Sequence, residues 1–276
     1  MADRLFSAAV WLSAALVAAA LLWIVGDLAR LGLSQLSLEF IFSAPENAGR
    51  SGGIGPILVS TLLIIGVTLA VALPLGLIVA VWLAEFTRRE NRLGNQIRLA
   101  LDVMAGIPSI VFGLFGNAFF SIYLGMGFSI LSGGLTLAII ILPVFIRTCE
   151  IGLTAVDNSW RQGAQALGMT RTSAVWHILL PAAAPAITAG LILGIGRATA
   201  ETAALIFTSG YVDRMPESLL DSGRALAVHI YDLSMNVTGG DPAAHASALL
   251  LIALIITFNL LAQGFSDRWL YRRLAT

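Results

Sequence analysis

Long stretches without a charged residue constrain this chain more than any other feature of its sequence. Charge-free windows cover residues 5–26, 51–84, 103–146 and 242–266, and a further apolar run extends over residues 182–208. A helix needs about 20 mostly apolar residues to cross a bilayer. The window 103–146 is long enough for two such helices, separated by a glycine-rich break. The sequence therefore predicts an all-α membrane protein with six transmembrane helices.

The composition excludes several classes of protein. Apolar residues make up 58% of the 276 residues and charged residues 12%, with a formal net charge of zero, whereas soluble domains contain roughly 25% charged residues. A soluble enzyme and a nucleic-acid-binding protein are therefore not expected. All 16 basic residues are arginine, so the chain lacks the lysine that a nucleotide-binding phosphate loop requires. With Cys149 as its single cysteine, it has no internal disulfide or cysteine metal cluster.

The distribution of arginines predicts the orientation of the helices. Cytoplasmic loops of membrane proteins are enriched in arginine and lysine. With the N-terminus inside, ten arginines fall on the inner side and four on the outer side, and Arg147 lies at a boundary. The inner set is Arg4, Arg88, Arg89, Arg92, Arg98, Arg161, Arg171, Arg268, Arg272 and Arg273, and the outer set is Arg30, Arg50, Arg214 and Arg224. We therefore expect a multi-pass protein of the cell inner membrane with both termini in the cytoplasm.

Arg197 and Glu201 interrupt the apolar run of the fifth predicted span. A guanidinium at the bilayer centre costs roughly 2.5–3.5 kcal/mol even on insertion scales, so its presence there needs a reason. Residues four positions apart share one face of a helix, and the pair is either a structural ion pair or part of an anion pathway. We favour the pathway, because arginine keeps its charge and its planar guanidinium matches an oxyanion.

Small residues at four-residue spacing follow the same run: Ala186, Gly190, Gly194 and Ala198. Such a stripe allows two helix backbones to approach closely within a bilayer. It predicts packing of the fifth span against a neighbouring helix or a second subunit.

Two long segments lie outside the predicted spans. Residues 216–233 of the outer segment are expected to form an amphipathic surface helix, with His229 as an incidental interfacial residue. The inner segment, Asp157 to Pro181, combines small, basic and apolar residues in a pattern that predicts two short helices joined at Gly168. By composition alone this inner segment is either an amphipathic connector on the membrane surface or a docking element for a cytoplasmic partner.

The inner segment resembles the signature of the permease subunits of ABC importers, which reads Glu-Ala-Ala, three residues, Gly, nine residues, Ile-x-Leu-Pro. The matching residues are Gln162, Gly163, Ala164, Gly168, Ile178, Leu180 and Pro181, with Arg161 directly before them. Gln162 replaces the usual glutamate and Gly163 the first alanine, and the spacing is otherwise complete. The resemblance implies a type I ABC importer permease fold, in which this loop forms a short coupling helix that contacts the ATPase subunit.

The similarity narrows to PstA-type permeases of phosphate importers. Residues 52–64, 73–86, 102–116 and 194–210 resemble that family, and the segment that contains Arg197, Glu201 and Thr202 is the most typical. The resemblance implies a transport subunit, not an enzyme, that forms half of a translocation pathway for inorganic phosphate. It implies a PstC-type permease as heterodimer partner, a PstB-type ATPase dimer that binds ATP and magnesium, and a PstS-type phosphate-binding protein. This chain itself is expected to hold no cofactor and no metal.

The predicted spans and the resemblance together suggest domain boundaries and a set of substrate-pathway residues. Residues 1–50 form an N-terminal helix with an outer loop, residues 51–265 a permease core of five spans, and residues 266–276 a cytoplasmic tail. The core contains the coupling loop at 157–181 and an outer loop at 209–244. The expected substrate pathway contains Arg197, with Glu201 holding its guanidinium, and Thr202 and Ser109 as hydroxyl donors. Two alternatives stay open: a permease for another oxyanion such as molybdate, tungstate or sulfate, and a secondary transporter that works alone.

Overall fold

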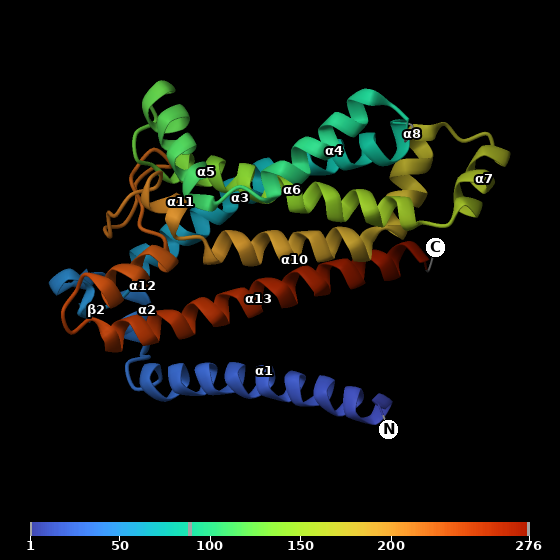
Figure 1. Ribbon diagram of the computed structural model, residues 1–276. Coiled ribbons are helices and arrows are strands. Elements are labelled where there is room, and N and C mark those ends of the chain that lie inside the picture. The colour runs from blue at the N-terminus through green and yellow to red at the C-terminus, as the bar shows by residue number, and fades with distance from the viewer. Residues whose placement is uncertain (1, 88–89, 275–276) are drawn as a thin grey trace.

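Helices form nearly all of the regular structure, as predicted (Figure 1). The computed structural model describes the backbone of residues 2–87 and 90–274, and the side chains of residues 3–87 and 90–264. Its four longest helices are α1 (Ala2–Gly32), α3 (Gly55–Val81), α6 (Ile130–Ala155) and α13 (Asp241–Leu274). Within the described chain these four are long and apolar enough to cross a membrane.

Two further spans are bent, which the sequence did not predict. Helix α4 (Arg92–Ala105) meets the helix that begins with α5 (Ser109–Gly116) and continues as η3 (Asn117–Tyr123) at 103°. The segment made of α8 (Arg171–Ala174), η4 (Val175–Leu179) and α9 (Leu180–Ala182) meets α10 (Ala184–Ala200) at 69°. If each bent pair counts as one span, the described chain has up to six, in agreement with the predicted number.

The centre of the bundle is the packing of α3 and α10 against α6. Ile64 of α3 and Leu137 and Ile141 of α6 are buried in the main hydrophobic cluster. The hydroxyl of Thr68 donates to the carbonyl oxygen of Gly134 at 3.1 Å, which joins α3 and α6 in the absence of water. A Cβ atom at Gly134 would lie 2.6 Å from the side chain of Val67. Glycine is therefore required at this helix contact.

The predicted small-residue stripe on α10 faces α6. Cβ atoms added at Gly190 and Gly194 would lie 3.2 Å from Phe145 and 3.5 Å from Ile141, both residues of α6. At Gly152 of α6, an added Cβ atom would lie close to the Cβ atom of Ala186. The stripe thus allows close packing within one chain, one of the two arrangements that its spacing predicted.

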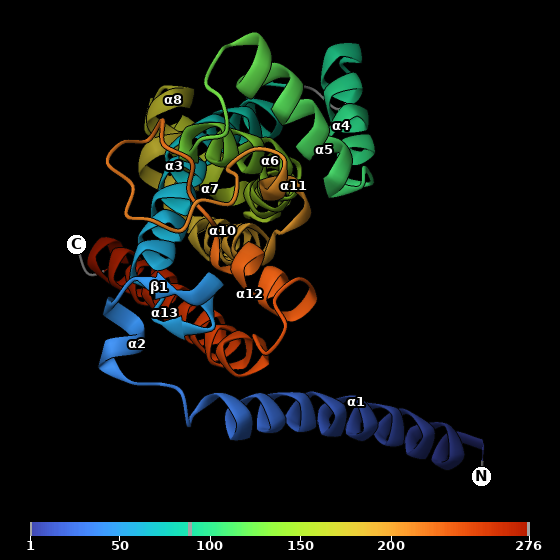
Figure 2. The same cartoon turned by 90° about the vertical axis from the view of Figure 1, so that its left-hand side faces the viewer.

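Helix α1 lies beside α13 and away from the other helices (Figures 1 and 2). Most of its apolar side chains are exposed, and Leu12 and Trp23 are 71% and 78% exposed. Helix α13 extends to Leu274, so the predicted tail at 266–276 begins inside a helix, and its residues 275 and 276 lie outside the described chain. Arg88 and Arg89, on which the predicted orientation partly rests, also lie outside it.

The end of the bundle away from α7 (Asn158–Ala166) contains short elements (Figure 1): α2 (Leu38–Phe42), a hairpin of β1 (Pro45–Glu46) and β2 (Ser51–Gly52) around η1 (Asn47–Gly49), α11 (Ala203–Ile206) and α12 (Leu226–Met235). The predicted surface helix at 216–233 is wrong for residues 216–225, which are irregular. Helix α12 buries one face, with Leu226, Val228 and Leu233, and exposes Tyr231 and Met235. His229 is fully buried and Arg224 lies beside it, with an Nη1–Nδ1 distance of 3.4 Å. Arg224 also pairs with Asp232 at 3.3 Å. His229 is therefore an internal residue of this region and not an interfacial one.

Candidate functional site

Helix α10 ends inside the bundle, next to the residues predicted to form the substrate pathway. Arg197 lies in its last turn, and the helix stops at Ala200. The backbone of Glu201 is extended (φ −73°, ψ 124°), Thr202 follows, and helix α11 begins at Ala203. The prediction of one continuous helix that places Arg197 and Glu201 on the same face is therefore wrong.

This break lies against the other bent span, the one formed by α4 and α5. Helix α11 packs on α5, and a Cβ atom at Gly113 of α5 would lie 2.8 Å from the Cα atom of Ala204. Figures 1 and 2 both show α5 beside α11. Ser109 is the first residue of α5 and follows the bend at Pro108. The end of α10 at Ala200 and the bend before Ser109 thus lie in one region of the bundle.

The four predicted pathway residues share this region without contacting one another through polar bonds. Arg197, Glu201, Thr202 and Ser109 are each half-buried. Among the described residues, no ion pair or side-chain hydrogen bond joins Arg197 to Glu201, so the predicted pair is absent. The guanidinium of Arg197 has no acidic partner in the described chain. A half-buried arginine without a counter-ion is costly in a membrane, and an anionic ligand is one means of compensating it.

A second site lies at the opposite end of the bundle, in the segment predicted to couple to a partner. Helix α7 (Asn158–Ala166) begins after Asp157, whose carboxylate accepts a hydrogen bond from the Ser159 amide at 2.7 Å. This bond lowers the pKa of Asp157 from its ordinary value. Gly168 ends the helix with φ +70°, a conformation that glycine adopts without steric strain. The two short helices joined at Gly168 match the prediction.

Arg161 connects α7 to the ends of two membrane spans. Its Nη2 atom lies 2.6 Å from a carboxylate oxygen of Glu85, in the π-helical turn η2 (Trp82–Phe86) that follows α3. Its guanidinium also donates to the carbonyl oxygens of Leu153 and Val156 at 2.8 and 2.7 Å. These carbonyl groups lie at the C-terminal end of α6, where helical partners are missing. A displacement of α7 would therefore act directly on α3 and α6.

The face of α7 that points away from the bundle exposes apolar side chains. Trp160 and Leu167 are 52% and 80% exposed, and nothing lies within 4 Å of a Cβ atom built at Gly163 or Gly168. A shallow pocket of about 420 Å³ lies between this face and the following helix. Ser159, Trp160, Gly163, Ala164, Leu167 and Ile178 line it. The predicted signature residues Gly163, Ala164 and Ile178 thus share one surface, whereas Leu180 and Pro181 are buried in the bundle.

A charged cluster between α4 and α6 was missed at the level of sequence. Glu150, whose side chain is 6% exposed, binds Arg98 at 2.5 Å and Arg147 at 2.9 Å. Arg147 also holds both carboxylate oxygens of Asp102, at 3.0 and 3.2 Å. The i,i+3 spacing of Arg147 and Glu150 was the available signal. Since each guanidinium already has acidic partners, the cluster fixes α4 to α6.

No cofactor site stands out in the described residues. They contain no group of three or more histidine, cysteine, aspartate or glutamate side chains that could hold a metal ion.

Comparisons with known proteins assign the chain to a family of transport components. Residues 72–275 match the family model described as binding-protein-dependent transport system inner membrane component. The chain is 31% identical to a probable ABC transporter permease protein, YqgI, of Bacillus subtilis, over 97% of this chain and 94% of the relative. It is 30% identical to the phosphate transport system permease protein PstA of Pasteurella multocida, over 89% of this chain and 87% of the relative. It also matches a longer PstA homolog of Mycoplasma pneumoniae with 34% identity, spanning 32% of that protein.

Solved structures of ABC transporters share the fold. A bacterial ABC transporter involved in the import of the acidic polysaccharide alginate matches with a TM-score of 0.64 and 14% identity, over 94% of this chain and 96% of the other. The inward-facing MetNI methionine ABC transporter matches with a TM-score of 0.55 and 19% identity, over 80% and 94% of the two chains. The predicted fold class, that of ABC importer permeases, is therefore confirmed.

Proposed function

Because this chain belongs to the family of binding-protein-dependent transport system inner membrane components, we propose that it is the PstA-type permease subunit of an ATP-driven importer for inorganic phosphate. It is a multi-pass membrane transport subunit and not an enzyme. The relation to PstA of Pasteurella multocida, which extends over 87% of that protein, supports phosphate as the substrate. One observation supports the pathway most directly: Arg197 is half-buried beside a helix break and has no acidic partner among the described residues.

The proposed pathway passes the region where α10 and α11 are interrupted. In lipid, irregular backbone is tolerated only where protein buries it or where it lines a water-filled cavity. Phosphate crossing this region needs a compensating charge, which the guanidinium of Arg197 supplies with two parallel donors. Glu201, near but not bonded to Arg197, weakens the attraction for the anion so that it is released. Thr202 and Ser109 are proposed to add hydroxyl donors at the same two helix breaks.

Helix α7 is proposed as the contact for the ATPase. Its exposed Trp160 and Leu167 offer an apolar surface, and Arg161 connects it rigidly to α3 and α6. Closure of an ATPase dimer would push α7, and the push would reach the two spans through Arg161. The proposed coupling residues are Arg161, Gln162, Gly163, Ala164, Gly168, Ile178, Leu180 and Pro181.

Permeases of this family work with an ATPase and an external substrate-binding protein. For this chain we propose a PstC-type permease as the other half of the pathway, a PstB-type ATPase dimer and a PstS-type phosphate-binding protein. ATP and magnesium would be bound by the ATPase and not by this chain. The α7 end of the bundle, with both chain termini, would then lie in the cytoplasm of an inner-membrane complex.

Phosphate uptake by variants of Arg197 tests the proposal. Arg197→Gln should abolish uptake while assembly with the partner subunits, measured by co-purification, stays normal. Arg214→Gln, a change of an exposed outer arginine, is the matched control and should transport normally. The double variant Arg197→Gln with Glu201→Gln removes both charges, so neither charge is left alone. If the two residues were only a structural pair, this double variant would transport again, and recovered uptake would refute the proposed pathway.

A further inference from the structure

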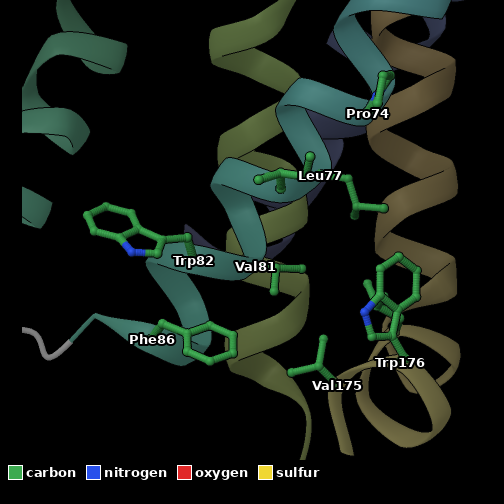
Figure 3. A pocket seen from close by; sticks show the side chains of 9 residues that line it. Pro74, Leu77, Val81, Trp82, Phe86, Val175 and Trp176 are labelled. Atoms are coloured by element: carbon green, nitrogen blue, oxygen red, sulfur yellow. The ribbon is translucent and has the colours of Figure 1, made fainter. Parts of the chain in front are cut away.

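An apolar groove lies between the last turns of α3 and the turn η4 (Figure 3). Its volume is about 590 Å³, within the ~300–1,000 Å³ range of small-molecule sites. Leu77, Val81 and Phe86 line one side, and Val175 and Trp176 line the other. Only apolar and aromatic side chains line it. The groove thus suits a hydrocarbon chain and offers no set of donors to hold a small polar solute.

The groove lies at one end of two membrane spans. The span formed by α3 and η2 ends at Phe86, and the bent span that contains η4 begins at Arg171. Two tryptophans border the groove at this level, Trp82 and Trp176, and the Trp176 side chain is 59% exposed. Tryptophan gathers where a membrane meets water, because its ring is apolar and its N–H is polar. The two tryptophans therefore fit a groove that opens at the height of the lipid headgroups.

Arg171 places a positive charge beside the groove. The guanidinium carbon of Arg171 lies 5.8 Å from the centre of the Phe86 ring, which itself lines the groove. Arg171 is exposed, and no acidic side chain of the described residues pairs with it. Glu85, which precedes Phe86 in η2, already binds Arg161 at 2.6 Å. The positive charge of Arg171 is thus uncompensated and available to an anion above the groove.

We propose that this groove binds an anionic phospholipid, with one acyl chain between α3 and η4 and the headgroup phosphate on Arg171. A basic residue over an apolar gap between spans, on the side of the anionic leaflet, is suited to such a headgroup. The apolar lining selects a lipid over a free phosphate ion, and the charge of Arg171 favours an anionic lipid over a zwitterionic one. This inference rests on the proposed orientation, with the α7 end of the bundle in the cytoplasm, and it does not depend on phosphate transport.

Quenching of tryptophan fluorescence by brominated lipids tests the proposal. The full chain and its Trp176→Phe variant are reconstituted into phosphatidylcholine vesicles that contain brominated phosphatidylglycerol or, at equal mole fraction, brominated phosphatidylcholine. The difference between the two proteins reports the lipid at Trp176. One arginine near anionic lipid contributes ~1 kcal/mol, so phosphatidylglycerol should occupy the site about fivefold more often than its mole fraction predicts. Arg171→Gln should remove this preference.

Arg92→Gln is the matched control, since Arg92 is an exposed arginine at the first residue of α4 and does not line the groove. The preference for phosphatidylglycerol should persist in that variant. Equal quenching by the two lipids in the unmodified chain would refute a specific anionic lipid site. Absence of quenching at Trp176 by either lipid would refute it as well, because the groove would then be covered by protein, such as a partner subunit or a second copy.

Discussion

Replacement of Arg161 by glutamine should loosen α7 without unfolding the bundle. Arg161 makes two bonds to Glu85 and one bond each to the carbonyl oxygens of Leu153 and Val156. The side chain of Glu85 is only 7% exposed, so the change leaves a buried carboxylate without its counter-charge. Removing one partner of a buried pair costs ~3–5 kcal/mol. Because Arg161 is itself 22% exposed, solvent screens part of the loss, and we expect about 2–3 kcal/mol.

Hydrogen exchange of the α7 amides measures this loss directly. A change of about 2–3 kcal/mol raises the local opening equilibrium roughly 30- to 160-fold, and the exchange rate rises with it. Amides in the middle of α3 and α6 should keep their protection. Gln162→Ala is the control, since the Gln162 side chain is exposed on the same helix and makes no hydrogen bond among the described residues.

The double variant Arg161→Gln with Glu85→Gln separates the ion pair from the rest of the bonds. It removes the unpaired buried charge and should regain about 1 kcal/mol or more relative to Arg161→Gln alone. Two results would contradict the reasoning: unchanged α7 exchange in Arg161→Gln, or effects of the two single changes that simply add. Either result would mean that Arg161 does not connect α7 to the spans.

Two further predictions concern the two ends of the bundle, at α7 and at α12. Gly168→Asp should leave the protein in the membrane but abolish co-purification of the ATPase, because φ is +70° there and the face is open. Gly239→Asp, the same change at another open glycine with positive φ (+79°) outside α7, should leave co-purification unchanged. Normal co-purification in Gly168→Asp would count against α7 as the contact. Burial and the neighbouring Arg224 lower the pKa of His229 from 6.5 to about 4, so the unfolded outer segment takes up a proton first as the pH falls. The stability of α12 should therefore fall by up to ~3 kcal/mol between pH 6.5 and pH 4, and His229→Gln should remove this dependence; hydrogen exchange of α12 with equal pH dependence in both proteins would refute it.

The spans could be predicted from the sequence because they follow from one physical requirement. A segment that crosses hydrocarbon must lack charge over about 20 residues, and the window 51–84 matches α3 closely. Helices α6 and α13 also fall on charge-free windows, but both continue past the end of the window, to Ala155 and Leu274. The bend between α4 and α5 had a visible signal, since Pro108 disfavours helical backbone at the residue before it. A search for charge-free stretches does not detect this signal, because proline adds no charge to an apolar run.

Other features depend on contacts between distant residues and were not predictable from one sequence. Arg98 and Glu150 lie 52 positions apart, and only the packing of α4 on α6 brings them together. The burial of His229 likewise depends on how α12 packs against α3 and α13. The coupling segment was easier to predict, since its signature is local in sequence and its two short helices are fixed by Asp157 and Gly168.

The end of α10 at Ala200 is the strongest physical reason to place the proposed pathway beside Arg197. No proline or glycine lies between Arg197 and Thr208, so local propensity gives the helix no reason to stop. In a membrane, each unsatisfied backbone group costs several kcal/mol, and a purely structural helix would gain stability by continuing through Glu201. An interruption held by tertiary packing of α11 against α5 fits the proposed pathway, which needs the guanidinium of Arg197 unpaired at the end of the helix. A structural ion pair would not need the interruption, because an unbroken helix would hold Arg197 and Glu201 one turn apart.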